Sequence, residues 1–258
     1  MDEPDRAIGS IPDRGRSRGV TAIDCRRSLL ARACIVVLCL ALEAACSTRP
    51  EPETATGRTA SIAAGQIGDD ARADALVDPT LLDPSILIDI RYATPANFTG
   101  VAVYPVARCL LRRDVAERLL RVQRALRREG VGVKLWDCYR PFSVQLRFWK
   151  LVPDPRYVAE PVVRDGRPVA GSKHNRGAAV DLTLVDGLGR ELEMPSAYDD
   201  FTERAHRDFA GASEKARRNA GRLEAAMVAE GFLPLPTEWW HFDGPGWEAY
   251  DISDEPLN

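Results

Sequence analysis

The apolar positions of the chain repeat with two different periods, and both periods occur within the same part of the sequence. In residues 86–90, 131–137 and 178–185, apolar side chains recur at every second position, which is the period of a half-buried strand. Between residues 115 and 126, and again between 216 and 227, they recur at spacings of four, three and four, which places them on one face of a helix. The pattern therefore predicts strands and helices in one domain.

Turn and cap residues set the limits of these elements. Asp114 is the expected N-cap residue of the first helix, Gly130 is its expected C′ residue, and Gly231 is expected to end the second helix. Pro141 opens a further short helix, and the proline-rich, charged residues 152–171 are expected to form a long surface loop. The resulting order lacks the regular alternation of a doubly wound fold. We therefore expect an α+β fold with a mostly antiparallel central sheet flanked by helices.

The N-terminal residues 1–46 have the features of an export signal. Paired arginines precede an apolar run over residues 33–42, which is too short for an ordinary transmembrane helix and is typical of a signal peptide. Small residues directly before Cys46 favour a lipoprotein signal, and a single uncleaved N-terminal anchor is the alternative. We expect an exported protein of the cell envelope or periplasm, attached to the membrane through this segment or through a lipid on Cys46, or released by cleavage.

A change in composition follows this segment. Residues 47–80 are rich in Thr, Pro, Glu, Ala and Asp, and such a stretch cannot bury enough apolar surface to fold. We expect residues 47–80 to form a flexible tether and residues 81–258 to form one folded domain.

The overall composition narrows the range of partners. The formal net charge is −3 and no basic stripe is present, so we expect no nucleic acid partner. Four of the six cysteines lie in the export segment, which leaves Cys109 and Cys138 in the domain, without the close spacing of a structural zinc site. In an oxidising compartment these two would form a disulfide, and the alternative is two buried thiols.

Two of the three histidines stand near carboxylates in a pattern that suits a metal. His174 lies in a polar loop, Asp181 follows seven positions later in a predicted strand, and His241 closes the sequence Glu-Trp-Trp-His. Catalytic zinc sites typically use three protein ligands of these types and leave a fourth position open. We predict that His174, Asp181 and His241 hold one zinc ion per chain, and that His206 is a solvated helix residue.

Two further residues could serve hydrolysis at such a site. Glu238 could accept a proton from a water molecule and pass it to a leaving amine. Positions 238 and 241 of a regular strand would face opposite sides, so we expect a bend that brings both side chains to one cavity. Arg140 follows a predicted strand and could stabilise a developing oxyanion, although an arginine considered alone is more often part of an ordinary ion pair. Trp239 and Trp240 are expected to be core or surface aromatics.

Taken together, these motifs resemble the D-alanyl-D-alanine dipeptidases of the VanX type, within the zinc D,D-peptidases. The resemblance extends over roughly residues 80 to 250, and it rests on four stretches of sequence: Asn97-Phe98-Thr99-Gly100, Trp136-Asp137-x-Tyr139-Arg140-Pro141, Ser172-x-His174-x6-Asp181 and Glu238-Trp239-Trp240-His241. It implies zinc binding by His174, Asp181 and His241, a catalytic base at Glu238 and transition-state stabilisation by Arg140. It also implies that Ser172 and Asp199 shape the substrate pocket, with Asp200 as the alternative to Asp199.

The resemblance implies hydrolysis of the small dipeptide D-Ala-D-Ala to D-alanine, and it implies no protein partner. A D,D-carboxypeptidase or endopeptidase acting on peptidoglycan stem peptides would use the same metal site in an open groove. A non-catalytic wall-binding lipoprotein that keeps zinc for stability is the alternative from another class. The segment 152–171 could cap a closed pocket or line a groove, so the sequence leaves the length of the substrate open.

Overall fold

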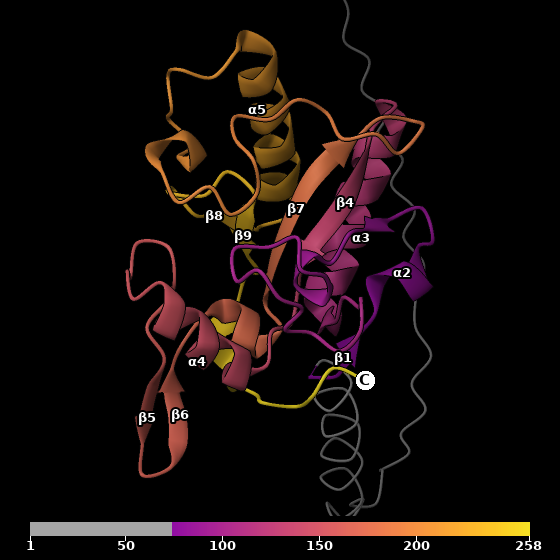
Figure 1. Ribbon diagram of the computed structural model, residues 1–258. Coiled ribbons are helices and arrows are strands. Elements are labelled where there is room, and N and C mark those ends of the chain that lie inside the picture. Colours follow the sequence, from indigo (N-terminus) through magenta and orange to yellow (C-terminus); the bar gives the residue numbers. More distant parts are fainter. Residues whose placement is uncertain (1–73) are drawn as a thin grey trace, which may run out of the picture. The chain divides into compact units, whose positions relative to one another are not determined.

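The computed structural model describes residues 74–258, and Figure 1 shows a central sheet with helices packed against it. The sheet consists, in spatial order, of β2 (Leu87–Ile88), β4 (Gly132–Asp137), β7 (Ala179–Val185), β9 (His241–Asp243) and β8 (Leu233–Pro234). β2 and β4 are parallel, whereas the other neighbouring pairs are antiparallel. The predicted α+β fold with a mostly antiparallel sheet is therefore confirmed.

Two long helices, α3 (Arg113–Arg128) and α5 (Glu214–Ala229), pack against each other and against β4 and β7. The predicted face of α3 is buried, and it includes Val115, Leu119, Val122 and Leu126. The helix ends as predicted, because Gly130 has a φ of 77° and the amide of Val131 donates to the carbonyl of Leu126.

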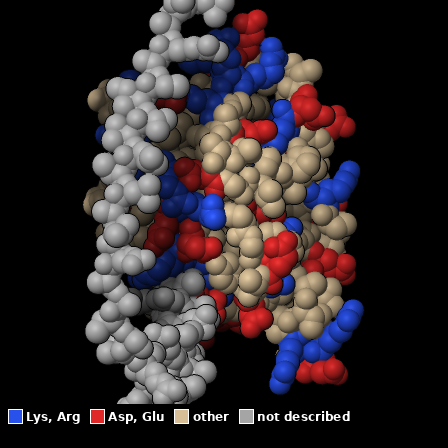
Figure 2. Space-filling model, turned by 180° about the vertical axis from the view of Figure 1, so that it is seen from behind, with Lys and Arg blue, Asp and Glu red and all other residues tan. Residues whose placement is uncertain are grey.

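On the face seen in Figure 2, basic and acidic side chains are interspersed.

The start of α3 differs from the prediction. Arg112 occupies the N-cap position and makes no side-chain cap, so Asp114 lies inside the first turn. The reason is tertiary: the amide of Arg112 donates to the carbonyl of Gly177, which fixes the chain before the helix begins. The carboxylate of Asp114 instead accepts hydrogen bonds from the amide of Val115 and the hydroxyl of Tyr250.

Three further boundaries differ from the sequence prediction. The folded part begins before residue 81, because β1 (Leu76–Val77) pairs with β3 (Leu111–Arg112) and α2 (Pro79–Leu82) follows it. The strand expected over 86–90 is reduced to the two residues of β2. The segment 152–171 is not a simple loop, because β5 (Val162–Arg164) and β6 (Arg167–Ala170) form an antiparallel hairpin within it.

The remaining elements agree with the prediction or are short. Pro141 precedes α4 (Phe142–Leu151), as expected. Single 3-10 turns are formed by η1 (Arg91–Ala93), η2 (Lys173–Arg176), η3 (Glu203–Ala205) and η4 (Trp247–Ala249). His206 ends η3 and lies outside the cavity described below.

Between residues 74 and 258, no helix combines the length and apolarity needed to cross a membrane. The predicted export signal and most of the predicted tether lie outside the described residues.

A disulfide joins Cys109 to Cys138, which decides between the two states expected for these cysteines. Cys138 follows directly after β4, and both cysteines are fully buried in the core. The bond therefore fixes the chain at the carboxyl end of β4, two residues before Arg140.

The two faces of β7 have different surroundings. Its residues Val180, Leu182 and Leu184 alternate with Asp181 and Thr183, so the two sets face opposite sides of the sheet. The apolar set belongs to the main core, whereas Asp181 lines a cavity on the other side. The strand that supports the core thus also presents a carboxylate to the candidate site.

Candidate metal centre and active site

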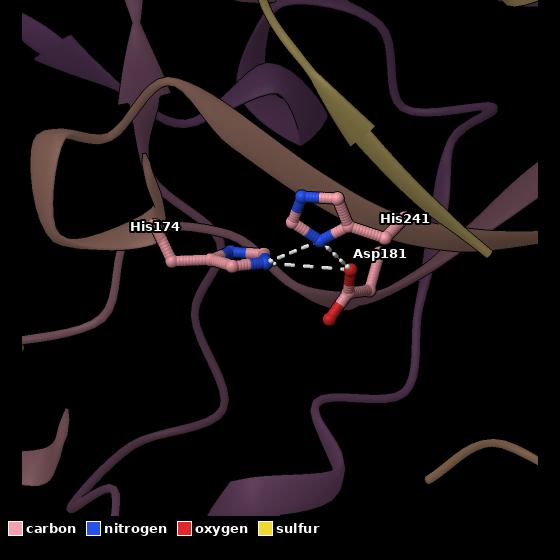
Figure 3. A group of neighbouring side chains, drawn as sticks. All are labelled: His174, Asp181 and His241. Atoms are coloured by element: carbon pink, nitrogen blue, oxygen red, sulfur yellow. Dashed lines mark hydrogen bonds and ion pairs between the residues drawn. The ribbon is translucent and has the colours of Figure 1, made fainter. Parts of the chain in front are cut away.

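The register between β7 and β9 brings two of the predicted ligands together. Asp181 lies directly opposite His241, and His174 reaches the same point from η2, just before β7 (Figure 3). Oδ1 of Asp181 is 2.9 Å from Nδ1 of His241 and 3.3 Å from Nε2 of His174, and the two ring nitrogens are 3.1 Å apart. Three side chains predicted from two separate motifs therefore converge with one ligand atom each.

Local hydrogen bonds explain how His174 is held. Ser172 caps η2, its hydroxyl accepting from the amide of His174, and Asn175 completes the capping box. The side-chain amide of Asn175 donates to the carbonyl of Arg140, and the amide of Arg140 donates to the carbonyl of His174. Gly177, at a φ of 68°, ends the turn in a conformation that suits glycine and leads into β7. The turn is thereby fixed against the segment that follows β4.

The hydrogen bonds of the ring nitrogens that point away from the candidate metal position determine the tautomers of His174 and His241. Nδ1 of His174 lies 2.6 Å from the carbonyl oxygen of Cys138, which can only accept, so this nitrogen carries the proton. Nε2 of His241 lies 2.9 Å from a carboxylate oxygen of Asp243 and donates to it in the same way. In neutral imidazoles, the two inner nitrogens then present lone pairs to each other and to the Asp181 carboxylate. Such an arrangement is stabilised by a cation between them, so the residues fit a metal ion.

The surrounding charges also favour a cation. Against the effect of burial, hydrogen bonds with Asp181 and Asp243 raise the pKa of His241 to about 10. Burial would raise the pKa of Asp181, but His174 and His241 lower it well below its ordinary value. The centre therefore attracts positive charge, which either a proton or a divalent metal ion can provide.

Glu238 lies at the edge of this centre. It belongs to the turn between β8 and β9, in which the amide of His241 donates to the carbonyl of Glu238. The predicted bend is therefore present, and Oε2 of Glu238 is 3.9 Å from Nδ1 of His241. Burial raises the pKa of Glu238 to about 7, an effect to which the charge of Asp181 adds. A carboxyl group of this kind can exchange a proton near neutral pH.

Arg140 is buried beside Asp137. Its Nε and Nη2 donate to one oxygen of Asp137 at 3.1 and 2.7 Å, and its Nη1 donates to the side-chain oxygen of Gln145 at 2.8 Å. Burial opposes its charge, but Asp137 raises the pKa of Arg140 well above the ordinary value. A guanidinium has five N–H groups, so two of them remain for a ligand after these bonds.

These residues line one cavity of about 160 Å³. Its wall includes the three candidate ligands together with Glu238, Arg140, Ser172 and Asp199. Asp199 faces this cavity and accepts from the hydroxyl of Tyr92, whereas Asp200 pairs with Arg204. The structure thus separates the two aspartates that the sequence left as alternatives. Burial, followed by the charge of Asp181, raises the pKa of Asp199 well above its ordinary value.

The segment between α4 and β5 forms part of the cavity wall. Residues 155–159 belong to this wall. Gln145 anchors them, because its side-chain amide donates to the carbonyl of Ala159 while its oxygen accepts from Arg140. The ring of Tyr157 packs against that of Phe201 at 5.3 Å. This part of the segment therefore lines the cavity and is held to it by Gln145.

Trp239 and Trp240 are core residues, each only 1% exposed, and the ring of Trp240 also reaches the cavity wall. The sequence analysis predicted no role for several other residues of the site. Asp137 and Asp243 stand within three residues of Arg140 and His241, so their positions in the motifs were an available signal. Tyr92, Gln145 and Tyr198 had no such signal, because the fold brings them to the site from separate segments.

A comparison with known families identifies the chain. The family model Peptidase_M15, described as D-ala-D-ala dipeptidase, matches residues 72–255. The chain belongs to this peptidase family. It is therefore a metallopeptidase, and the convergence of His174, Asp181 and His241 provides a candidate site for the metal of this M15 peptidase.

Several relatives are named D-alanyl-D-alanine dipeptidase. The protein from Escherichia coli (strain K12) is 37% identical over 177 residues, which cover 69% of this chain and 88% of the relative. The one from Enterococcus faecium is 34% identical, covering 65% and 86%, and the one from Streptomyces coelicolor is 33% identical, covering 73% and 94%. A solved structure titled "VanYB in complex with D-Alanine-D-Alanine" matches with 18% identity and a TM-score of 0.35, over 55% of this chain and 75% of that chain.

Proposed function

We propose that this M15 peptidase hydrolyses D-Ala-D-Ala to two molecules of D-alanine, using one zinc ion held by His174, Asp181 and His241. The observation that carries the proposal is the single small cavity that these residues share with Glu238, Arg140 and Asp199. Its volume of about 160 Å³ lies below the roughly 300–1,000 Å³ of pockets that take drug-sized ligands. A dipeptide is the class of peptide that suits such a space.

The donor set supports zinc among the divalent metals. Two imidazole nitrogens and one carboxylate oxygen form a usual set for catalytic zinc, with the fourth position open. When bound, the ion would act as a Lewis acid and lower the pKa of a water molecule to roughly 7. The hydrogen bonds from His174 to Cys138 and from His241 to Asp243 fix both rings in the tautomer that such binding requires.

The remaining roles follow from the chemistry of each side chain. Glu238 accepts a proton from the attacking water and delivers it to the leaving amine nitrogen, and burial of its side chain, which raises the pKa of Glu238, favours this exchange. The two free N–H groups of Arg140 donate to the carbonyl oxygen as its negative charge develops. Because Asp137 and Gln145 hold the guanidinium from behind, it needs no rearrangement to do so.

Asp199 and Ser172 would bind the ends of the dipeptide. A free α-ammonium group pairs with the carboxylate of Asp199, and its charge offsets the burial that otherwise disfavours the ionised acid. The hydroxyl of Ser172 accepts from the amide of His174, so its own proton remains available for a carboxylate oxygen of the substrate. Residues 155–159 line the same small cavity, and we infer that they limit the length of the peptide that it admits.

The first test compares three substrates in the purified chain loaded with zinc: D-Ala-D-Ala, N-acetyl-D-Ala-D-Ala and a stem pentapeptide ending in D-Ala-D-Ala. We expect kcat/KM for the two blocked substrates to be at least about tenfold lower, because they lack the ammonium group that Asp199 pairs with. Preference for the blocked substrates would support a carboxypeptidase instead. Absence of hydrolysis of all three, despite stoichiometric zinc, would support the wall-binding alternative.

We further propose that the chain is exported, so that it acts on dipeptide released outside the cytoplasmic membrane. The disulfide between Cys109 and Cys138 supports this location, because disulfides persist in oxidising compartments. Mass spectrometry of the mature N-terminus from a cell-envelope fraction is expected to find the residues before Cys46 removed. An intact residue 1 in that fraction would contradict cleavage, and recovery in the cytoplasm would contradict export.

A further inference from the structure

Tyr198 connects to the candidate metal centre through an atom that the ligand geometry leaves free. Both histidines approach Oδ1 of Asp181, at 2.9 and 3.3 Å. The hydroxyl of Tyr198 lies 2.9 Å from the other carboxylate oxygen, Oδ2. An ionised carboxylate can only accept, so the tyrosine hydroxyl donates this hydrogen bond. The two oxygens of Asp181 are therefore used differently, one for the imidazoles and one for Tyr198.

Aromatic neighbours fix the position of this hydroxyl. The ring of Tyr198 packs against the rings of Trp136 and Trp240, with centroids 4.9 and 5.4 Å apart. Tyr92 lies on another side, at 6.1 Å between centroids. A ring held in this way limits where its hydroxyl can lie, so the hydrogen bond constrains the carboxylate rather than following it. The same packing would accept phenylalanine, which differs only by the missing oxygen.

The residue next to Tyr198 reaches the substrate side of the cavity. Asp199 has a φ of 57°, an uncommon value for a residue other than glycine, and its carboxylate accepts from the hydroxyl of Tyr92. Two neighbouring residues therefore have different contacts: Tyr198 donates to the candidate metal ligand Asp181, and Asp199 lies in the cavity wall.

We propose that Tyr198 is a positioning residue for the metal: its hydroxyl holds Oδ2 of Asp181 and thereby keeps Oδ1 turned toward His174 and His241. This inference rests on the metal site of the proposed function. Without the hydroxyl, the carboxylate of Asp181 can rotate about its Cβ–Cγ bond. Metal binding must then restrict this rotation, which lowers the affinity for the metal. Loss of such a partner typically weakens metal affinity or activity by about 10- to 100-fold.

The test is the variant Tyr198→Phe in the full chain. Zinc affinity is measured by competition with a chromogenic chelator, and the ligand field is measured from the visible spectrum after loading with Co²⁺. We expect zinc to bind about 10- to 100-fold more weakly and the Co²⁺ bands to shift. Tyr250→Phe is the matched control, because it removes a tyrosine hydroxyl that also donates to an aspartate, Asp114, but lies outside the cavity; its zinc affinity is expected to equal that of the wild type.

A second measurement separates metal positioning from folding. The Tm of each protein is recorded with zinc and with excess chelator, and the difference reports metal binding to the folded state. A smaller difference in Tyr198→Phe, with an unchanged Tm in chelator, supports the inference. Wild-type zinc affinity and an unchanged Co²⁺ spectrum in Tyr198→Phe, or equal weakening in Tyr250→Phe, would overturn it while leaving the proposed function intact. Failure of the wild type to bind zinc would instead contradict the proposed function.

Discussion

Replacement of Glu238 by glutamine is expected to leave metal binding intact and to lower kcat by about 10²- to 10⁴-fold, the usual contribution of a positioned acid or base. The amide has nearly the same shape as the carboxylate, so the buried turn between β8 and β9 can keep its packing. It cannot accept a proton from water, however, and it cannot return one to the leaving amine. Because Glu238 is not one of the three converging ligands, the ion should remain.

The measurement combines metal content with steady-state kinetics on D-Ala-D-Ala. The purified variant should contain one zinc per chain and should show a kcat loss much larger than any change in KM. Glu248→Gln is the matched control, since this exposed glutamate of η4 lies near the same end of the chain but outside the cavity. Full activity of Glu238→Gln would show that another group carries the proton, and loss of zinc would make Glu238 a ligand.

The strands and helices that carry the site were predictable because burial imposed a clear period on them. β7 and α3 each place a long row of apolar residues in one core, and the alternation or the helical spacing reports that directly. Two-residue strands have no period. β1 was therefore assigned to a tether, although its pairing with β3 makes it part of the fold. Tertiary pairing of short segments is the information that a local pattern cannot contain.

The β5–β6 hairpin was missed for a different reason. Its prolines and charges favoured a loop, since Pro168 cannot donate to a ladder hydrogen bond in an interior strand. Between the two strands, Asp165 and Gly166 have φ values of 50° and 74°, which suit the primed turns of tight hairpins. Asp-Gly was visible in the sequence, so the turn residues carried a signal that the composition of the segment obscured.

The residues of the candidate site also fall into two groups, those predictable from local sequence and those that depend on tertiary contacts. His174, Asp181, Glu238 and His241 could be proposed because each stands in a short motif and because histidine is rare in this chain. Tyr198 and Gln145 act only through partners that the fold supplies, Asp181 in one case and Arg140 in the other. Residues that can bind a metal were thus predictable by type and spacing. Residues that hold those groups in place required the register and packing of the whole domain.

Arg140→Lys is expected to lower kcat/KM by about 10²- to 10³-fold, corresponding to roughly 2.7–4 kcal/mol of lost transition-state stabilisation. The guanidinium uses three N–H groups on Asp137 and Gln145 and still offers two to the substrate. A lysine ammonium has three N–H groups in all and lacks the planar fork, so it cannot hold both partners and also reach the developing oxyanion.

The accompanying stability measurement distinguishes this role from a purely structural ion pair. Lysine keeps a positive charge beside the fully buried Asp137, whereas Arg140→Ala leaves that carboxylate unpaired and should cost about 3–5 kcal/mol in the free energy of unfolding. Urea unfolding of the zinc-loaded proteins should therefore rank the wild type and Arg140→Lys well above Arg140→Ala, while both variants lose activity. If Arg140→Lys retained wild-type kcat/KM, charge pairing with Asp137 alone would explain why an arginine stands here, and the oxyanion would have to be stabilised by another group.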